Sequence, residues 1–438
     1  MAGSPRHLQM DPRELYDEYM ITSMVAGFEP VVVESASGCL ITGDDEREYI
    51  DCFSGIAVCN AGHGHPRVLA AAREQMERLV HCCTCIYYNP RAAELARRLA
   101  DVTPGDLQKS FFANSGAEAI EGALRLAKQH TGRREIVCLT MSFHGRTAGT
   151  LSITGLRTRK QGSGPYLSGV AFAPAPYCYR CPFKSSYPEC GVACGEFIGN
   201  VLRYQTTGDV AAFVLEPVLG EGGIIPLPPE YMTMAAEAAR EEGALLIVDE
   251  VQTGFGRTGS LFATDDYDVQ PDMMCMAKGI ADGFPLGAFI VRSEVADAFR
   301  PGDHLSTFGG NPVSCAAALA NIDVMIDEEL PQAAAERGGQ LITGLSELRE
   351  KCSLVGDVRG KGLMIGLELV SDGDKTPAPD EAAAVRALCR EQGVLVGCGG
   401  AFGNVVRLQP PLVITEEQVE RVLSVVSASV SEIASAAQ

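Results

Sequence analysis

The stretch Leu245-Leu246-Ile247-Val248-Asp249-Glu250-Val251-Gln252 decides the fold class of this chain. Its first four residues are apolar enough to form a strand that is buried on both faces, which is typical of a parallel sheet covered by helices. The strand then ends in two carboxylates. Because open α/β sheets bind ligands at the carboxyl edge of their strands, we expect Asp249 to contact a ligand.

Working outward from this strand, apolar runs of strand length alternate with amphipathic runs. We expect further strands at residues 136–139, 211–215 and 273–277, with helices at 118–129 and 231–242. The first helix is preceded by Asn114-Ser115, and Glu118 follows three residues after Ser115, which is the pattern of a capping box. The alternation predicts a large α/β domain.

The two ends of the chain are expected to form a smaller α+β domain. The N-terminal end carries only short strands, at 31–33 and 38–42, which are too few for a core of their own. Past Pro331 the pattern changes to a long amphipathic helix followed by strands and helices. We therefore expect an N-terminal segment of the small domain at 1–60, the large ligand-binding domain at 61–330, and the C-terminal part of the small domain at 331–438.

The composition excludes several classes of protein. The 438 residues include 36 Lys and Arg against 56 Asp and Glu, a formal net charge of −20, which argues against nucleic-acid and anionic membrane partners. With 46% hydrophobic and 21% charged residues, the chain is typical of a globular protein. The first twenty residues lack the apolar core of a signal peptide, and no run is long enough to span a bilayer. We therefore expect a cytoplasmic protein.

A lysine and a helix start provide candidate chemistry near Asp249. Lys278 follows the strand expected at 273–277, and its amine could form a Schiff base while Asp249 keeps a pyridine nitrogen protonated. Ser115, Gly116 and Ala117 open a helix whose exposed N–H groups suit an anion. Taken singly, each feature has a structural alternative, namely a buried Lys–Asp ion pair or a capped helix start without a ligand.

Six motifs occur together over nearly the whole chain: Asn114-Ser115-Gly116-Ala117-Glu118-Ala119, Ser142-Phe143-His144-Gly145-Arg146-Thr147, Leu215-Glu216-Pro217 with Gly220-Glu221-Gly222-Gly223, residues 249–259, Ala277-Lys278-Gly279, and residues 306–312. In these residues the chain resembles the class III aminotransferases, a fold type I family that uses pyridoxal 5′-phosphate (PLP). The resemblance implies a large domain with a mainly parallel seven-stranded sheet flanked by helices. It also implies a smaller α+β domain built from both termini, and a homodimer or dimer of dimers with active sites at the interface.

The resemblance also implies which residues hold the cofactor. Lys278 would carry PLP as a Schiff base and move a proton as general base and acid, while Asp249 would pair with the pyridinium nitrogen. Ser115, Gly116 and Ala117 would bind the phosphate, together with Ser306 and Thr307 supplied by the other subunit. Phe143 and Val251 would lie against the two faces of the ring. Glu250 and Gln252 would lie at its edge.

Two arginines and two glutamates would bind the substrates. By resemblance, Arg146 would bind the distal carboxylate of an ω-amino acid, and Arg407 the α-carboxylate of a dicarboxylate, since guanidinium groups bind carboxylates bidentately. Glu221 would act as a gate that neutralises Arg407 until a dicarboxylate arrives, and Glu216 would lie at the same site. The implied reaction moves an amino group from a 4-aminobutyrate-like or basic amino acid to 2-oxoglutarate.

An inserted segment leaves two alternatives open. Cys178, Cys181, Cys190 and Cys194 have spacings similar to those of zinc ligands, and they could bind metal, stay as reduced thiols or form disulfides. A non-catalytic metal-binding protein is therefore a remote competing class. The insertion also looks like one found in PLP-dependent amino-acid racemases. A racemase would share Lys278 and Asp249 but return the proton to the opposite face of Cα.

Overall fold

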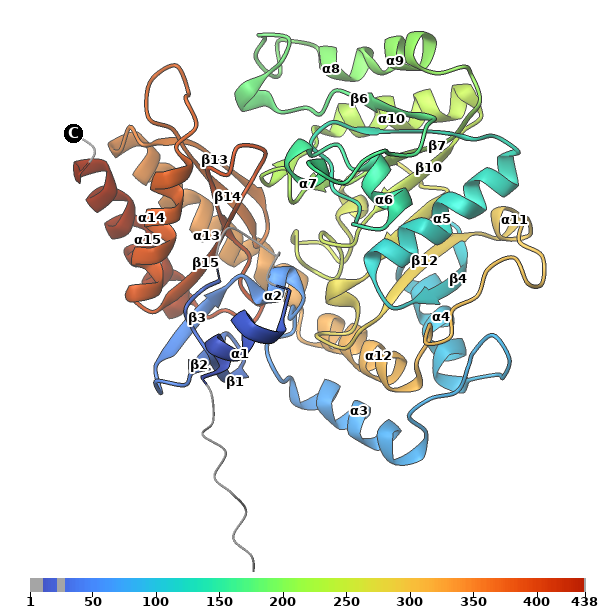
Figure 1. Cartoon of the computed structure of the whole chain (residues 1–438), viewed down its shortest axis with the longest axis horizontal. Helices are drawn as coiled ribbons and strands as arrows, with labels where there is room; N and C mark the ends of the chain where they lie inside the picture. The colour runs from blue at the N-terminus through green and yellow to red at the C-terminus, as the bar shows by residue number, and fades with distance from the viewer. Residues whose placement is uncertain (1–10, 22–27, 437–438) are drawn as a thin grey trace, which may run out of the picture.

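The computed structural model describes residues 11–21 and 28–436. The chain folds around two seven-stranded sheets (Figure 1). Part of the expected N-terminal segment, including residues 1–10 of the stretch searched for a signal peptide, lies outside the described residues, as do residues 437 and 438. Among the helices that are described, none is long and apolar enough to cross a membrane.

The larger part of the chain is built on a mainly parallel sheet with strand order β4-β12-β11-β10-β7-β5-β6. Only β12 runs antiparallel to its neighbours. The expected strands are all present, with bounds that differ by one or two residues. The strands in sheet order are β4 (Leu107–Ala113), β12 (Gly287–Arg292), β11 (Met273–Met276), β10 (Leu245–Asp249), β7 (Val210–Leu215), β5 (Glu135–Leu139) and β6 (Val170–Ala173).

Both faces of this sheet are covered, so β7, β10 and β11 are buried throughout. Their unbroken apolar sequence reflects that position, because a strand with two buried faces has no polar face to alternate with. Helix α5 (Gly116–Thr131) packs against one face and α10 (Pro229–Glu242) against the other, each in its own apolar cluster. The fold class predicted from the alternation of strands and helices is confirmed.

The second sheet joins the two ends of the chain. Strand β3 pairs in parallel with β15, which brings residues near 50 beside residues near 395 (Figure 1). The first strand was expected at 31–33 but begins only at Val33, since pairing with β2 rather than apolarity sets its bounds. The strands in sheet order are β1 (Val33–Ser37), β2 (Leu40–Gly43), β3 (Glu48–Cys52), β15 (Val394–Gly399), β16 (Val405–Leu408), β14 (Met364–Leu369) and β13 (Val355–Lys361).

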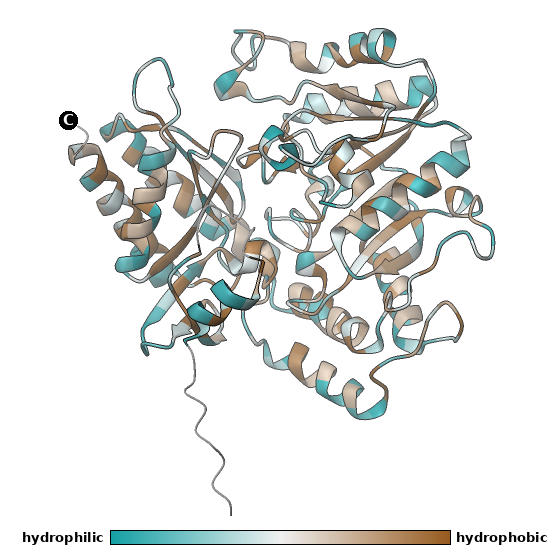
Figure 2. Ribbon diagram, in the orientation of Figure 1, coloured by the Kyte–Doolittle hydropathy of each residue, from teal (hydrophilic) through white to brown (hydrophobic). Residues whose placement is uncertain are grey.

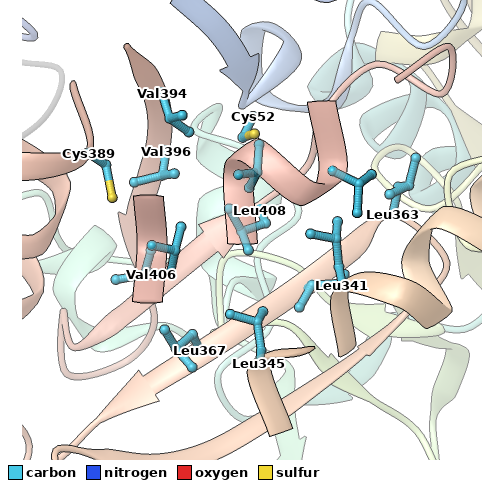
Figure 3. Packing of buried hydrophobic residues seen from close by; sticks show 14 of the residues in the cluster. Cys52, Leu341, Leu345, Leu363, Leu367, Cys389, Val394, Val396, Val406 and Leu408 are labelled. Carbon is cyan, nitrogen blue, oxygen red and sulfur yellow. The ribbon is translucent and has the colours of Figure 1, made fainter. Parts of the chain in front are cut away.

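Three long helices cover the second sheet. Figure 3 shows Leu341 and Leu345 of α13 packed toward Leu367 of β14 and Leu408 of β16. The central strands of the sheets are mostly apolar, whereas the outer helices mix apolar and polar residues (Figure 2). The three helices are α13 (Leu330–Lys351), α14 (Pro379–Glu391) and α15 (Glu416–Ala436). The domain boundaries that we expected at residues 60 and 330 stay a prediction.

The remaining elements connect the sheets or lie at their edges. They include the small hairpin of β8 (Val218–Leu219) and β9 (Ile225–Pro226). The other α-helices are α1 (Pro12–Tyr19), α2 (Ser54–Ala57), α3 (Pro66–Arg78), α4 (Pro90–Val102), α6 (Ala148–Ile153), α7 (Arg157–Lys160), α8 (Ala193–Glu196), α9 (Ile198–Gln205), α11 (Ser293–Ala296) and α12 (Pro312–Asp327).

Candidate active site

Asp249 and Lys278 lie at the same edge of the large sheet. Strands β10 and β11 pair in parallel with Asp249 opposite Cys275, so both strands end side by side. Lys278 follows β11 with a positive φ of 47°, and it lines the same cavity as Asp249. Desolvation lowers the pKa of Lys278, although the nearby Glu221 and Asp249 carboxylates favour its charged form. An amine with a lowered pKa is better suited to act as a nucleophile or base near neutral pH.

One cavity of about 440 Å³ gathers most of the predicted site residues. Its size suits a small cofactor with a substrate. Its walls come from the carboxyl ends of β4, β10 and β11 and from the loop before α6, which are far apart in the sequence. The predicted residues that line it are Ser115, Gly116, Ala117, Phe143, Arg146, Glu216, Asp249, Val251, Gln252 and Lys278.

Asp249 is held by a buried histidine that the sequence analysis did not single out. His144 Nδ1 lies 2.7 Å from Asp249 Oδ2, and the Val251 N–H donates to Oδ1 at 3.0 Å. Burial disfavours a charged imidazole, but the hydrogen bond and charge of Asp249 outweigh it and raise the pKa of His144. The only signal in the sequence was the position of His144 between Phe143 and Arg146. A histidine that donates to Asp249 fixes the orientation of its carboxylate.

The start of α5 forms a cup of small residues. Ser115 caps the helix by accepting from the Glu118 N–H at 3.2 Å, as expected, but the Glu118 carboxylate accepts from the Asn114 N–H rather than from that of Ser115. A Cβ on Gly116 would lie 2.8 Å from Val251 Cγ1, so only glycine fits. The first N–H groups of a helix have no partner within it. The cup therefore fits a phosphate group.

The side of the cavity beneath Phe143 is fixed by Glu216. This buried carboxylate accepts from the N–H of Phe143 at 2.8 Å and from that of Gly220 at 3.1 Å. Burial raises the pKa of Glu216 to about 7, with the charge of Asp249 adding to the effect and that of His144 opposing it. Gln252 accepts from Gln409 Nε2 at 3.1 Å. Phe143 and Val251 both line the cavity, so a flat ring between them fits the space.

Glu221 and Arg407 form a buried ion pair beside this cavity. Arg407 Nη1 donates to Glu221 Oε1 at 2.7 Å, as the gate hypothesis expects. A second arginine, Arg159, donates from Nη2 to the other oxygen at 2.9 Å. Burial opposes ionisation of Glu221, but Arg407, Lys278 and Arg159 outweigh it and lower its pKa to about 2. Arg159 lies outside every motif, and nothing in the sequence pointed to it.

Comparison with known proteins identifies the family. The family described as aminotransferase class-III matches residues 23–430. The chain is 42% identical to an acetylornithine aminotransferase of Methanothermobacter thermautotrophicus over 92% of this chain and 95% of the relative. A leucine/methionine racemase of Thermococcus litoralis is 38% identical, over 93% and 92%. A solved Bacillus anthracis aminotransferase superposes with a TM-score of 0.90 at 33% identity and covers 97% of this chain and 100% of that one.

The chain belongs to the class III aminotransferases. The family explains why a lysine, a carboxylate and a phosphate cup converge on one cavity, since this arrangement fits PLP. It also removes the competing class of a non-catalytic metal-binding protein. The recognition made from the six motifs is confirmed.

Three of the predicted cofactor residues lie away from the cavity of this aminotransferase. The Glu250 carboxylate instead accepts from the N–H and hydroxyl of Thr264 at 2.7 and 2.6 Å. Successive side chains along an extended backbone point to opposite sides, so Asp249 and Glu250 cannot both face the cavity. Ser306 and Thr307 line a separate hollow on the outer side of Asn114.

Arg146 stands at the exposed rim of the aminotransferase cavity. Its guanidinium carbon lies 5.8 Å from the centre of the Phe143 ring. An aromatic face attracts a cation at this distance, which orients the guanidinium without using its N–H groups. This contact leaves the N–H donors of Arg146 available at the rim of the cavity.

The four cysteines of the insertion come together in space. Cys178, Cys181, Cys190 and Cys194 are free thiols that line one small cavity of about 20 Å³. Across residues 11–21 and 28–436, no group of three or more His, Cys, Asp or Glu side chains is arranged to hold a metal ion. The segment is fixed to β14 by Arg180, whose Nε donates to Glu368 Oε1 at 2.6 Å.

Proposed function

We propose that this aminotransferase transfers an amino group from an ω-amino acid, 4-aminobutyrate-like or basic, to 2-oxoglutarate. The observation that carries the proposal is the buried Glu221–Arg407 ion pair at 2.7 Å beside Lys278. The donor would place no α-carboxylate against Arg407, whereas the dicarboxylate acceptor would. The enzyme therefore needs a cation that is neutralised while the donor is bound and released for the acceptor. Acetylornithine, named for a relative, has a terminal amine whose carbon bears no carboxylate.

The cavity residues divide into those that hold PLP and those that hold the substrate. The cup of Ser115, Gly116 and Ala117 would bind the phosphate, and Asp249 would meet the ring nitrogen with His144 behind it. When bound, PLP supplies an electron-withdrawing ring that acidifies the C–H of the carbon bearing the substrate's reacting amine. Glu250 is not assigned a cofactor contact in this proposal, because its carboxylate is hydrogen-bonded elsewhere.

The protein side of the reaction falls to Lys278 and the arginines. Lys278 would bind the cofactor covalently and then, once displaced by the substrate amine, take the proton from the carbon that bears the reacting amine. Its lowered pKa supports this role, since the free amine accepts a proton. Arg146 at the rim would bind the distal carboxylate of the donor, while Arg407 would bind the α-carboxylate of the acceptor.

Racemisation is the second candidate, because one relative is a leucine/methionine racemase. Incubating the PLP-loaded protein with a single amino acid and no oxo acid separates the two reactions. An aminotransferase should stop after one half-reaction, with the amino group retained on the cofactor. A racemase should continue and accumulate the opposite enantiomer, and that result would refute the proposal.

We further propose a cytoplasmic homodimer, or a dimer of dimers, in which Ser306 and Thr307 complete the phosphate site of the other subunit. Exposed apolar side chains near this segment and in the loop before α4 support an interface: Ile86, Tyr87, Tyr88, Leu305 and Phe308. Light scattering of the purified protein measures the mass. A monomer that is fully active at all concentrations would contradict the shared site.

A further inference from the structure

The Glu221 carboxylate is shared between two arginines from distant parts of the chain. Its Oε1 accepts from Arg407 Nη1 at 2.7 Å and its Oε2 from Arg159 Nη2 at 2.9 Å. Arg407 lies on β16 and is almost fully buried, while Arg159 lies on the short helix α7 and is partly buried. Glu221 is therefore a bridge between the two arginines.

Each arginine uses only part of its donor set on this bridge. The Nε atoms of Arg159 and of Arg407 are both buried and have no hydrogen-bond partner in the described part of the chain. On Arg159 the bonded Nη2 and the free Nε can together bind one carboxylate at two points. A small movement of Glu221 toward Arg159 could complete that pair of bonds and release Arg407.

The position of Arg159 is fixed by its neighbours. Lys160 Nζ donates to the carbonyl of Ser152 at 3.0 Å and stands over the rings of Tyr166 and Phe172, 4.5 and 4.9 Å from their centres. Tyr166 also donates from its hydroxyl to the carbonyl of Lys160. These contacts hold α7 against α6, so Arg159 is placed in advance to receive a carboxylate.

We propose that Arg159 is a positioning residue that keeps Glu221 paired when an incoming carboxylate displaces it from Arg407. The inference rests on the proposed function and adds the partner that Glu221 moves to. Leaving a buried carboxylate without a partner is costly, so an arginine waiting on the far side lowers the cost of opening the gate. Arg159 would thereby favour α-carboxylate substrates without contacting them.

The test measures binding and the two half-reactions in Arg159→Met. Glutarate has the two carboxylates of 2-oxoglutarate but no reactive carbonyl, so calorimetry with the PLP-loaded enzyme reports gate opening without turnover. We expect the Kd for glutarate to rise about 10- to 100-fold and the kcat/KM of the 2-oxoglutarate half-reaction to fall by about the same factor. The reason is that Glu221 has no charged partner left when it leaves Arg407. The half-reaction with an ω-amine should stay within about threefold of wild type, since Arg407 stays neutralised.

Two variants and a double substitution make the outcome decisive. Arg157→Met removes the same charge from the exposed face of the same helix and should change nothing, while Arg159→Lys should restore part of the effect. In a Glu221→Gln background, Arg159→Met should no longer alter glutarate binding. Equal losses in both half-reactions, or an effect that persists in the Glu221→Gln background, would overturn the inference.

Failure of this inference can be told apart from failure of the proposed function. If the wild-type enzyme neither transaminates 2-oxoglutarate nor binds glutarate, the proposed function fails and the inference fails with it. If the wild-type enzyme does both and Arg159→Met behaves like Arg157→Met, only the role of Arg159 is refuted. If Arg159→Met does not fold, Arg159→Lys is used instead. The ratio of kcat/KM in the two half-reactions is then compared between Arg159→Lys and wild type.

Discussion

Replacing Arg407 by alanine separates the carboxylate gate from general damage to the active site. Arg407 is buried on β16, between Gly366 of β14 and Gly397 of β15, and its guanidinium lies 5.1 Å from the centre of the Phe53 ring. If it binds the α-carboxylate of 2-oxoglutarate, Arg407→Ala removes a charge-assisted bidentate contact. The loss should be about 2–4 kcal/mol, or about 30- to 1,000-fold in kcat/KM of that half-reaction.

The half-reaction with an ω-amine should lose much less. Removing Arg407 does not strand the Glu221 carboxylate, because Arg159 stays bonded to its other oxygen at 2.9 Å. We therefore expect less than about a tenfold loss in this step, since the buried charge keeps a partner. Arg407→Lys, which keeps the charge but not the planar pair of donors, should fall between wild type and alanine with 2-oxoglutarate.

Single-turnover absorbance changes of the cofactor, followed separately for each half-reaction, give the two rate constants. Circular dichroism and PLP affinity serve as controls for folding and for the integrity of the site. A comparable loss in both half-reactions would show that Arg407 supports the structure of the cavity. An unchanged rate with 2-oxoglutarate would show that another group binds the α-carboxylate. Either result would refute the reasoning.

Three further predictions test the cup, the gate and the junction of the sheets. Gly116→Val should weaken PLP binding at least about tenfold, because a Cβ there would lie 2.8 Å from Val251 Cγ1, and an unchanged Kd by fluorescence titration would contradict the cup. The pKa of Glu221, about 2, lies below its ordinary value of 4.5, so its stabilising effect is complete above pH 4.5 and declines as the pH falls toward 2. Between pH 5 and pH 3, wild type should lose about 2 kcal/mol more unfolding free energy than Glu221→Gln, and parallel denaturation profiles would disprove this. Arg257→Met should destabilise the fold by about 2–4 kcal/mol, because the buried guanidinium donates to Asn60 and to the carbonyls of Leu363 and Pro410, and an unchanged midpoint of thermal unfolding would count against it.

The sequence by itself determined the fold class and the core of the proposed cofactor site. The apolar strand at 245–249 and the small residues at 115–117 act through local rules, namely burial of a continuous apolar run and the free N–H groups of a helix start. The position of Lys278 near Asp249 also followed, because two adjacent parallel strands end at the same edge of a sheet.

Only the tertiary structure decided which side chains meet across long separations in the chain. His144 bonds Asp249 and Arg159 bonds Glu221, yet neither pair shares a local pattern that marks its members as partners. Glu250 was predicted beside the cofactor, but the direction in which the chain leaves β10 turns its carboxylate toward Thr264. A buried charge needs a partner, and the partner that is available depends on how whole elements pack. The sequence therefore does not specify the partner before the elements are in place.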